Sequence, residues 1–256
     1  MMTTPVRALT PGAFLDAPAG GLIEADRGLW GSDGLHGGLS LALMAGAMSA
    51  HLPGRALESA TIRFHRPITE AFRLETELDG FGRTLPTATA RAFTGLGPCA
   101  DATAVFASAH TGGHRVVTRP APAVPGPERC ERLVVPPETM PVASHLDIRP
   151  AGPALPRSGG TAPVRTAWIR LTEDDTPPDF RRLVFLLDVP APSRPTVQLT
   201  AHPGLGLSRA SSPWVLVRAA TRPAAGDGWT DERVDAWGPD GLHLGSARRL
   251  RVVRGA

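Results

Sequence analysis

Residues 34–67 read GLHGGLSLALMAGAMSAHLPGRALESATIRFHRP, and this stretch decides the fold. A glycine pair opens an apolar run over residues 39–50, built largely from Ala, Leu and Met, which all favour helix. A helix that is apolar on every side is buried, and this one is too short to cross a bilayer, which needs about 20 apolar residues. The rest of the chain must therefore wrap around it. We expect the wrapper to be a sheet, because alternating segments follow.

Alternation of apolar and polar residues predicts strands in both halves of the chain. The predicted strands cover residues 59–67, 72–78, 87–93 and 100–109, and then residues 145–149, 164–171, 196–203, 214–220, 231–237 and 242–253. A second helix is expected over residues 179–188, after Pro177 and Pro178, with Asp175 or Thr176 as its cap. The order of helix, strands and glycine-rich turns occurs twice, which indicates a duplicated domain.

Residues 112–143 are rich in Pro, Gly and Arg, which is typical of a connection between two units. We therefore predict an N-terminal unit over residues 1–114, a Pro-rich linker over residues 115–143 and a C-terminal unit over residues 144–256. Each unit is expected to hold an antiparallel sheet around one buried helix, which is an α+β arrangement.

Composition excludes several classes of function. The formal net charge is +3 and all 27 basic residues are Arg, but no dense basic run suggests nucleic-acid binding. Two cysteines are too few for a disulfide framework or a metal cluster, and no two histidines have zincin spacing. Residues 95–100 match a dinucleotide fingerprint by letters but precede a strand, so we interpret them as a hairpin turn. We predict no metal and no cofactor. The N-terminus lacks a signal peptide's apolar core, so we expect a cytoplasmic protein that does not bind membranes.

Four stretches together resemble TesB-like acyl-CoA thioesterases, which are double hotdog proteins. They are Trp30 followed by HGG at residues 36–38, LPGRALESATIRFHRP at residues 52–67, FLLDVPAPSRPTVQLTAHP at residues 185–203 and DGLHLGSARRLRVVR at residues 240–254. The resemblance implies a double hotdog fold, with two antiparallel sheets that each wrap a central helix. It also implies hydrolysis of an acyl thioester carried by CoA or an acyl carrier and, by analogy, a homodimer.

The same resemblance implies three catalytic positions. The family's Asp ends the second helix and its Thr starts the next strand, which correspond to Asp188 and Thr196. The family's Gln lies in the last strand, where this chain has Arg249. This is a departure, because Arg donates hydrogen bonds but cannot accept one from water. Asp188 is a candidate even without the resemblance. Burying a carboxylate at the end of an apolar run costs free energy unless the group is paired with a cation or has a function.

Other residues are predicted to bind the substrate or the oxyanion. Gly37 and Gly38 precede an apolar helix, whose first N–H groups and dipole can stabilise an oxyanion, although glycines there could instead serve close packing. His36, with Asp33 nearby, is similar to the Asp/His pair of hotdog dehydratases, but the spacing differs. The remaining candidates for substrate contact are Trp30 and Gln198.

The sequence thus predicts an acyl thioesterase, in which an Asp orients water, Arg249 or Gln198 contacts the carbonyl or the water, and glycine amides hold the oxyanion. The acyl chain is expected beside the first helix, where the small residues at positions 45–47 leave room. Two alternatives stay open. One is a non-catalytic acyl-binding protein in which Arg249 marks a lost site, and the other is a hotdog dehydratase or hydratase.

Overall fold

The computed structural model describes residues 9–17, 20–79, 85–107, 119–152, 164–189, 195–224 and 228–252. The α-helices of these residues are α1 (Pro11–Leu15), α2 (Gly37–Ser49) and α3 (Phe180–Asp188). The 3₁₀ helices are η1 (Arg27–Leu29), η2 (Pro127–Arg129), η3 (Pro141–His145) and η4 (Leu207–Arg209). The strands are β1 (Ala56–Phe64), β2 (Arg73–Asp79), β3 (Thr87–Thr94), β4 (Gly97–Ala107), β5 (Leu146–Pro150), β6 (Val164–Leu171), β7 (Thr196–Pro203), β8 (Val215–Pro223), β9 (Trp229–Trp237) and β10 (His243–Val252).

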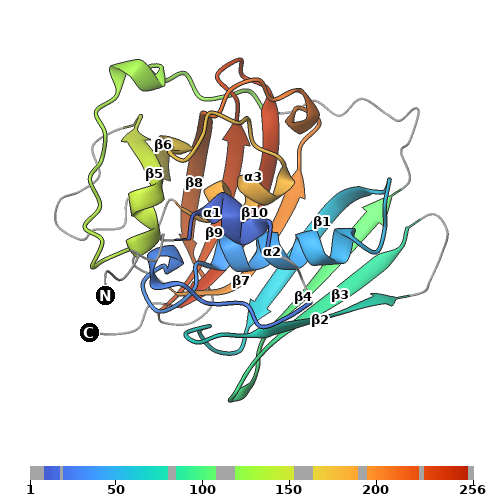
Figure 1. The fold of residues 1–256 in the computed structure, drawn as a ribbon. Coiled ribbons are helices and arrows are strands. Elements are labelled where there is room, and N and C mark those ends of the chain that lie inside the picture. The colour runs from blue at the N-terminus through green and yellow to red at the C-terminus, as the bar shows by residue number, and fades with distance from the viewer. Residues whose placement is uncertain are drawn as a thin grey trace, which may run out of the picture.

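Within the described ranges, the strands form one continuous sheet in the order β2-β3-β4-β1-β7-β10-β9-β8-β6-β5 (Figure 1). The prediction of two sheets is therefore wrong. Strand β1 of the first half pairs antiparallel with β7 of the second, with Ile62 opposite Leu199. Each of these strands would otherwise be an edge with unpaired N–H and C=O groups, and their pairing satisfies both edges at once.

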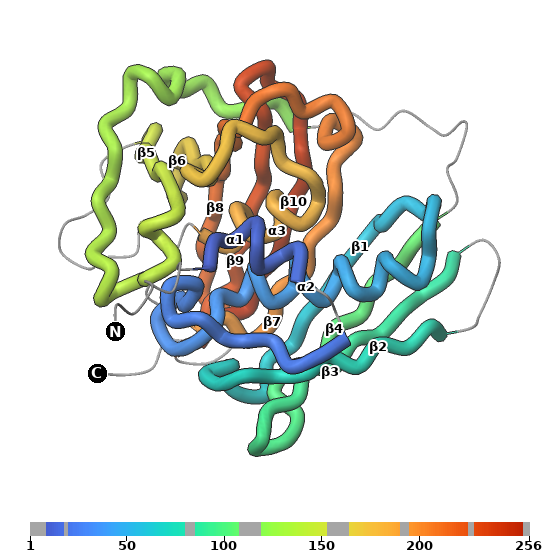
Figure 2. The backbone as a smooth tube through the Cα atoms, in the orientation of Figure 1, coloured from blue at the N-terminus to red at the C-terminus, as the bar shows by residue number. Residues whose placement is uncertain are grey.

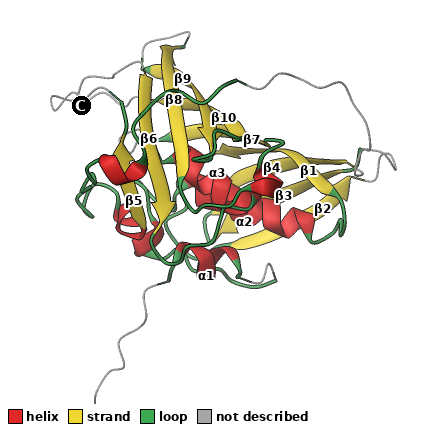
Figure 3. Ribbon diagram, turned by 90° about the horizontal axis from the view of Figure 1, so that it is seen from above, coloured by secondary structure: helices red, strands yellow, loops and turns green. Residues whose placement is uncertain are grey.

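The sheet curves around the helices, which lie together on its inner side (Figure 3). Helix α2 is buried as its composition predicts, since its Leu and Met side chains are at most 3 % exposed. Helix α3 of the second half lies against α2 (Figure 2). This contact brings the first turn of α2 to the last turn of α3, so the two halves meet where the sequence predicts a site.

Two predicted boundaries are wrong for local reasons. Helix α3 is capped by Asp179 and not by Asp175 or Thr176, because the Asp179 carboxylate accepts the Arg182 N–H at 2.8 Å. Strand β1 ends at Phe64 and not at Pro67, because the chain leaves the ladder after a last pairing with Ala100. The hairpin turn predicted over residues 95–100 lies between β3 and β4 but is shorter, because only residues 95–96 connect the strands and residues 97–100 belong to β4.

The described part of the predicted linker packs on the second half. The indole N–H of Trp237 donates to Arg119 O at 3.0 Å, and that of Trp168 donates to Pro125 O at 2.8 Å. The start of the predicted linker, up to residue 118, lies outside the described residues. The unit boundaries at residues 114 and 143 stay a prediction. No helix in the described part of the chain is long and apolar enough to span a membrane.

Candidate active site

The first turn of α2 begins with two glycines that leave no space for a side chain. A Cβ atom at Gly37 would lie 2.9 Å from Asp188 Oδ2. One at Gly38 would lie 2.9 Å from both Asp188 Cβ and Val184 O. Glycine at both positions therefore lets the start of α2 approach the end of α3 at this distance.

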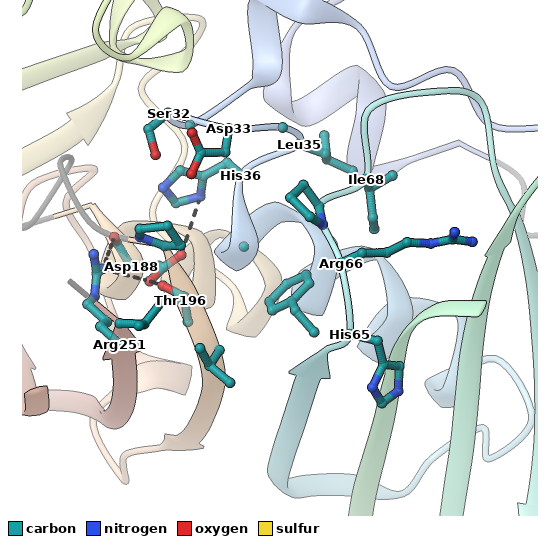
Figure 4. Close-up of a pocket in the computed structure, with 18 of the residues that line it drawn as sticks. Ser32, Asp33, Leu35, His36, His65, Arg66, Ile68, Asp188, Thr196 and Arg251 are labelled. Carbon is teal, nitrogen blue, oxygen red and sulfur yellow. Dashed lines mark hydrogen bonds and ion pairs between the residues drawn. The ribbon is translucent and has the colours of Figure 1, made fainter. Parts of the chain in front are cut away.

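Asp188 is the last residue of α3, and it is only 4 % exposed. Its Oδ2 accepts the Gly38 N–H at 2.9 Å. Its Oδ1 accepts from Thr196 Oγ1 at 3.4 Å, Arg251 Nη2 at 3.2 Å and Arg249 Nη1 at 3.3 Å (Figure 4). The structure thus brings a carboxylate of the second half to a glycine amide of the first.

Two arginines of β10 separate Asp188 from a second buried carboxylate, that of Glu232 on β9. Glu232 and Arg249 are fully buried, and Arg251 is 2 % exposed. Glu232 Oε2 lies 2.9 Å from Arg249 Nη2 and 2.9 Å from Arg251 Nε. Two carboxylates therefore face two guanidinium groups, which balances charges that would be costly to bury alone.

The surroundings of Asp188 keep it ionised. Burial is the largest single effect and raises the pKa of Asp188. The charges of His36, which is protonated only at the acidic pH where Asp188 titrates, and of Arg251 and Arg249 together outweigh it, and the pKa lies below its ordinary value. Such a carboxylate is a weak proton acceptor at neutral pH. Its position suits it to orient a water molecule more than to deprotonate one.

His36 precedes α2, and its side chain lies between Asp188 and Phe185. Burial lowers the pKa of His36 to about 4, against the opposing charge of Asp188, so the imidazole is neutral at pH 7. The ring meets Phe185 edge-on with centroids 5.1 Å apart, and His36 Nδ1 lies 3.7 Å from Asp188 Oδ2. The sequence pairs His36 with Asp33, whereas the carboxylate within ion-pair distance belongs to Asp188.

This burial predicts a pH-dependent stability. His36 takes up a proton near pH 4 in the folded state and near pH 6.5 in the unfolded state. Between these values the unfolded state binds more protons, so the free energy of unfolding falls as the pH is lowered, by roughly 3 kcal/mol for this group. Urea denaturation from pH 4 to pH 7 measures it. A His36→Gln variant should lose this part of the slope, and an unchanged slope would contradict the account.

A pocket opens beside Asp188, between the two halves of the chain (Figure 4). It is lined by residues 31–37, 64–68 and 195–197 with Met140, Asp188, Arg251 and Val252. Four predicted site residues are among them: His36, Gly37, Asp188 and Thr196. Thr196 is the first residue of β7, and its side chain lies next to Asp188 in the pocket lining (Figure 4).

The acyl chain was expected beside the middle of α2, and the pocket does not extend there. Among the described residues, Gly37 is the one residue of α2 that lines it. At Gly46, the space that a Cβ would need is bordered by Arg181 Cδ at 3.2 Å. Gly46 therefore lets α2 pack closely against Arg181, and the pocket beside Asp188 does not run along the small residues of α2.

The other four predicted site residues do not line the pocket, and they are Arg249, Gly38, Trp30 and Gln198. Arg249 lies behind Asp188 and does not reach the substrate side, because its guanidinium is held between two carboxylates. The Gly38 N–H is already bonded to Asp188. The Trp30 indole N–H donates to Ala25 O at 2.9 Å, and Arg27 stacks on its ring at 5.1 Å, so Trp30 supports the loop before α2.

A bulge in β7 explains why Gln198 does not join the site. Thr196 pairs with Arg251 and Gln198 with Leu250, so Val197 is the extra residue between them. Leu250 and Arg251 are adjacent on one strand and point to opposite faces of the sheet. Thr196 and Gln198 therefore lie on opposite faces, although they are two positions apart and would share a face in a regular strand.

Sequence reasoning missed Glu232 and the role of Arg251. Alternation offered a signal, because Arg249 and Arg251 follow Ala247 on the buried face of the last strand. Two arginines on a buried face require nearby carboxylates. Glu232 alternates with the buried residues Val234 and Ala236 on the neighbouring strand, which places it on the same face.

The fold and this site can now be compared with known proteins. The acyl-CoA thioesterase N-terminal domain model matches residues 27–107, and the acyl-CoA thioesterase C-terminal domain model matches residues 127–253. No curated protein matches the sequence. A hotdog-fold protein of unknown function from Alicyclobacillus acidocaldarius is similar in structure, with a TM-score of 0.81, 21 % identity and coverage of 95 % of this chain and 98 % of its own. The acyl-CoA thioesterase II TesB2 from Mycobacterium marinum has a TM-score of 0.74 at 16 % identity and covers 96 % of this chain and 99 % of its own.

The two domain models account for most of the chain, and the similar structures show the hotdog fold over nearly its full length. The chain belongs to the acyl-CoA thioesterase family and is a hydrolase that cleaves acyl thioesters.

Proposed function

We propose that hydrolysis takes place in the pocket beside Asp188, with Asp188 and Thr196 holding the attacking water. The observation that carries this proposal is a buried, ionised carboxylate that lines a pocket and lies against the first turn of a helix. Thr196 Oγ1 is 3.4 Å from Asp188 Oδ1, so one water could bridge the hydroxyl and the carboxylate. The water becomes acidic as its oxygen bonds to the thioester carbon, so Asp188 can accept its proton at that point although it is a weak base. The C–S bond then breaks and the leaving thiolate takes up a proton, which gives free thiol and carboxylic acid.

The oxyanion that develops during attack needs hydrogen-bond donors. The Gly38 N–H is bonded to Asp188, whereas no acceptor for the Gly37 N–H is found among the described residues. Gly37 lines the pocket at the positive end of α2. We therefore assign the oxyanion contact to the Gly37 N–H. The neutral imidazole of His36 can donate one further hydrogen bond to the thioester oxygen.

The carrier of the acyl group is CoA or an acyl carrier, and we propose CoA because both matching domain models describe acyl-CoA thioesterases. Arg66 lines the same pocket, and its planar guanidinium suits a phosphate group of the carrier. A homodimer is expected by analogy with other hotdog proteins.

Release of free thiol from a panel of acyl-CoA substrates tests the proposed function. A thioesterase releases one thiol for each acyl group. A hydratase or dehydratase would change the acyl chain without thiol release, and an acyl-binding protein would bind the panel without turnover. If no substrate of the panel or its acyl-carrier counterparts releases thiol, the proposal is refuted.

Replacing Thr196 tests the water contact directly. Thr196→Val keeps the shape of the side chain and removes one hydrogen bond, so we expect kcat to fall about tenfold with a small change in KM. Thr200→Val is the matched control, because Thr200 lies on the same strand and bonds Thr61 at 3.0 Å, away from the pocket lining. Equal effects of the two substitutions would count against the assignment.

A further inference from the structure

Glu232 lies on β9 beyond the two arginines that contact Asp188, and it does not line the pocket. We propose that Glu232 is a positioning residue for the reaction, which fixes Asp188 through Arg249 and Arg251. The inference rests on the proposed function, in which Asp188 holds the attacking water. It adds a residue that touches neither substrate nor water.

Both oxygens of the Glu232 carboxylate have partners among the described residues, Oε1 through a hydrogen bond and Oε2 through ion pairs. Oε1 accepts the Thr221 hydroxyl at 2.8 Å and lies 3.4 Å from Arg165 Nη2. Oε2 lies 2.9 Å from Arg249 Nη2 and 2.9 Å from Arg251 Nε. Residues of β6, β8 and β10 thus surround this carboxylate of β9. A carboxylate with these contacts can hold the side chains of the two arginines in place.

Both arginines then extend from Glu232 to the same oxygen of Asp188. Arg249 Nη1 is 3.3 Å and Arg251 Nη2 is 3.2 Å from Asp188 Oδ1. Each guanidinium therefore has a carboxylate at either end, with a hydrogen bond to Asp188 and an ion pair to Glu232. If the Glu232 end is released, the arginines can rotate and the Asp188 carboxylate can shift with them. A shift of about 1 Å in a positioned group can cost about 100-fold in rate.

The charges of the buried cluster also support a positioning role for Glu232. Arg249 stands where the resembled family carries a neutral Gln, so it brings an extra positive charge into the site. His36 is neutral at pH 7 and adds no further positive charge. Glu232 supplies the second buried carboxylate, which balances the charge of Arg249. The geometry thus indicates that Arg249 and Glu232 work as a pair in place of the family's amide.

Three variants test the pairing by kcat and KM on the best acyl-CoA substrate. Glu232→Gln and Arg249→Gln should each lower kcat at least tenfold and leave KM within about twofold, because neither residue lines the pocket. The double variant Glu232→Gln with Arg249→Gln removes one charge of each sign and places Gln at the family position. Its kcat should exceed that of both single variants. A double variant no better than the worse single variant would overturn the inference.

Two further variants separate positioning from stability. Asp147→Asn is the matched control, because Asp147 is also a buried carboxylate, 4 % exposed and 3.0 Å from Arg149, on the far edge strand β5. It should lower stability and leave kcat unchanged. Should Glu232→Gln fail to fold, Glu232→Asp keeps the charge and shortens the side chain, and its kcat should still fall. A Glu232→Asp variant with the kcat of the wild type would refute the positioning role.

The Asp188→Asn variant keeps failure of this inference distinct from failure of the proposed function. If Asp188→Asn remains fully active, the proposed site is wrong whatever the Glu232 variants do. If Asp188→Asn is inactive while folded Glu232 variants match the wild type in kcat, the positioning role alone is refuted.

Discussion

Asp188→Asn is expected to lower kcat by roughly 10²- to 10⁴-fold, the range usual for a positioned group that acts on a transferring proton. The amide keeps the size of the carboxylate but loses the charge that holds water and the two arginines. KM should change little, since Asp188 is proposed to contact the water and not the acyl group. Thiol release from acyl-CoA measures both parameters.

The same substitution should also lower the free energy of unfolding. It leaves Arg249 and Arg251 with the single buried carboxylate of Glu232. Removing one partner of a buried ion pair lowers the free energy of unfolding by about 3–5 kcal/mol. Activity must therefore be expressed per folded molecule, with the folded fraction taken from urea denaturation. A folded Asp188→Asn variant with kcat within threefold of the wild type would contradict the proposed mechanism.

Gly38→Ala is expected to lower stability and activity together. The new Cβ would lie 2.9 Å from Val184 O and 3.0 Å from Phe185 Cα, which are backbone atoms of α3 and cannot turn aside. Overpacking of this kind costs about 3 kcal/mol. It would also move the Gly38 N–H away from Asp188, so kcat should fall with stability. Urea denaturation and thiol release measure the two effects.

Gly46→Ala in the same helix is the matched control. Its Cβ would meet Arg181 Cδ at 3.2 Å, the flexible part of a side chain that is 35 % exposed and can give way. Alanine is a better helix former than glycine by about 1 kcal/mol. The free energy of unfolding should therefore stay the same or rise by up to about 1 kcal/mol. If both alanine variants lose the same stability, the close contact between α2 and α3 is not what requires Gly38.

The sequence predicts much of the fold because local patterns suffice for it. An apolar helix must be buried, and alternating segments must form strands, wherever they lie in the chain. The single sheet was not predictable in this way. Whether β1 and β7 pair with each other or remain edge strands depends on how the two folded halves dock. No residue of either strand gives a signal for that docking.

The site was predicted in part for the same reason. Asp188 can be predicted because it ends an apolar helix, and Gly37 because it belongs to a glycine pair before another. The resemblance to the family adds Thr196 and Arg249. The bulge at Val197 removes Gln198 from the site through a one-residue change of register, which alternation does not show. Glu232 and Arg249 lie on neighbouring strands and contact each other on the buried face of the sheet. The sequence shows the alternation that places each residue on that face, but not their contact.

A crystal structure of the Asp188→Asn variant with an acyl-CoA substrate bound tests the central claim most directly. The account predicts that the thioester lies in the pocket lined by His36, Gly37 and Thr196, with its carbonyl oxygen hydrogen-bonded to the Gly37 N–H. A thioester bound elsewhere, for example on the outer face of the sheet, would contradict it.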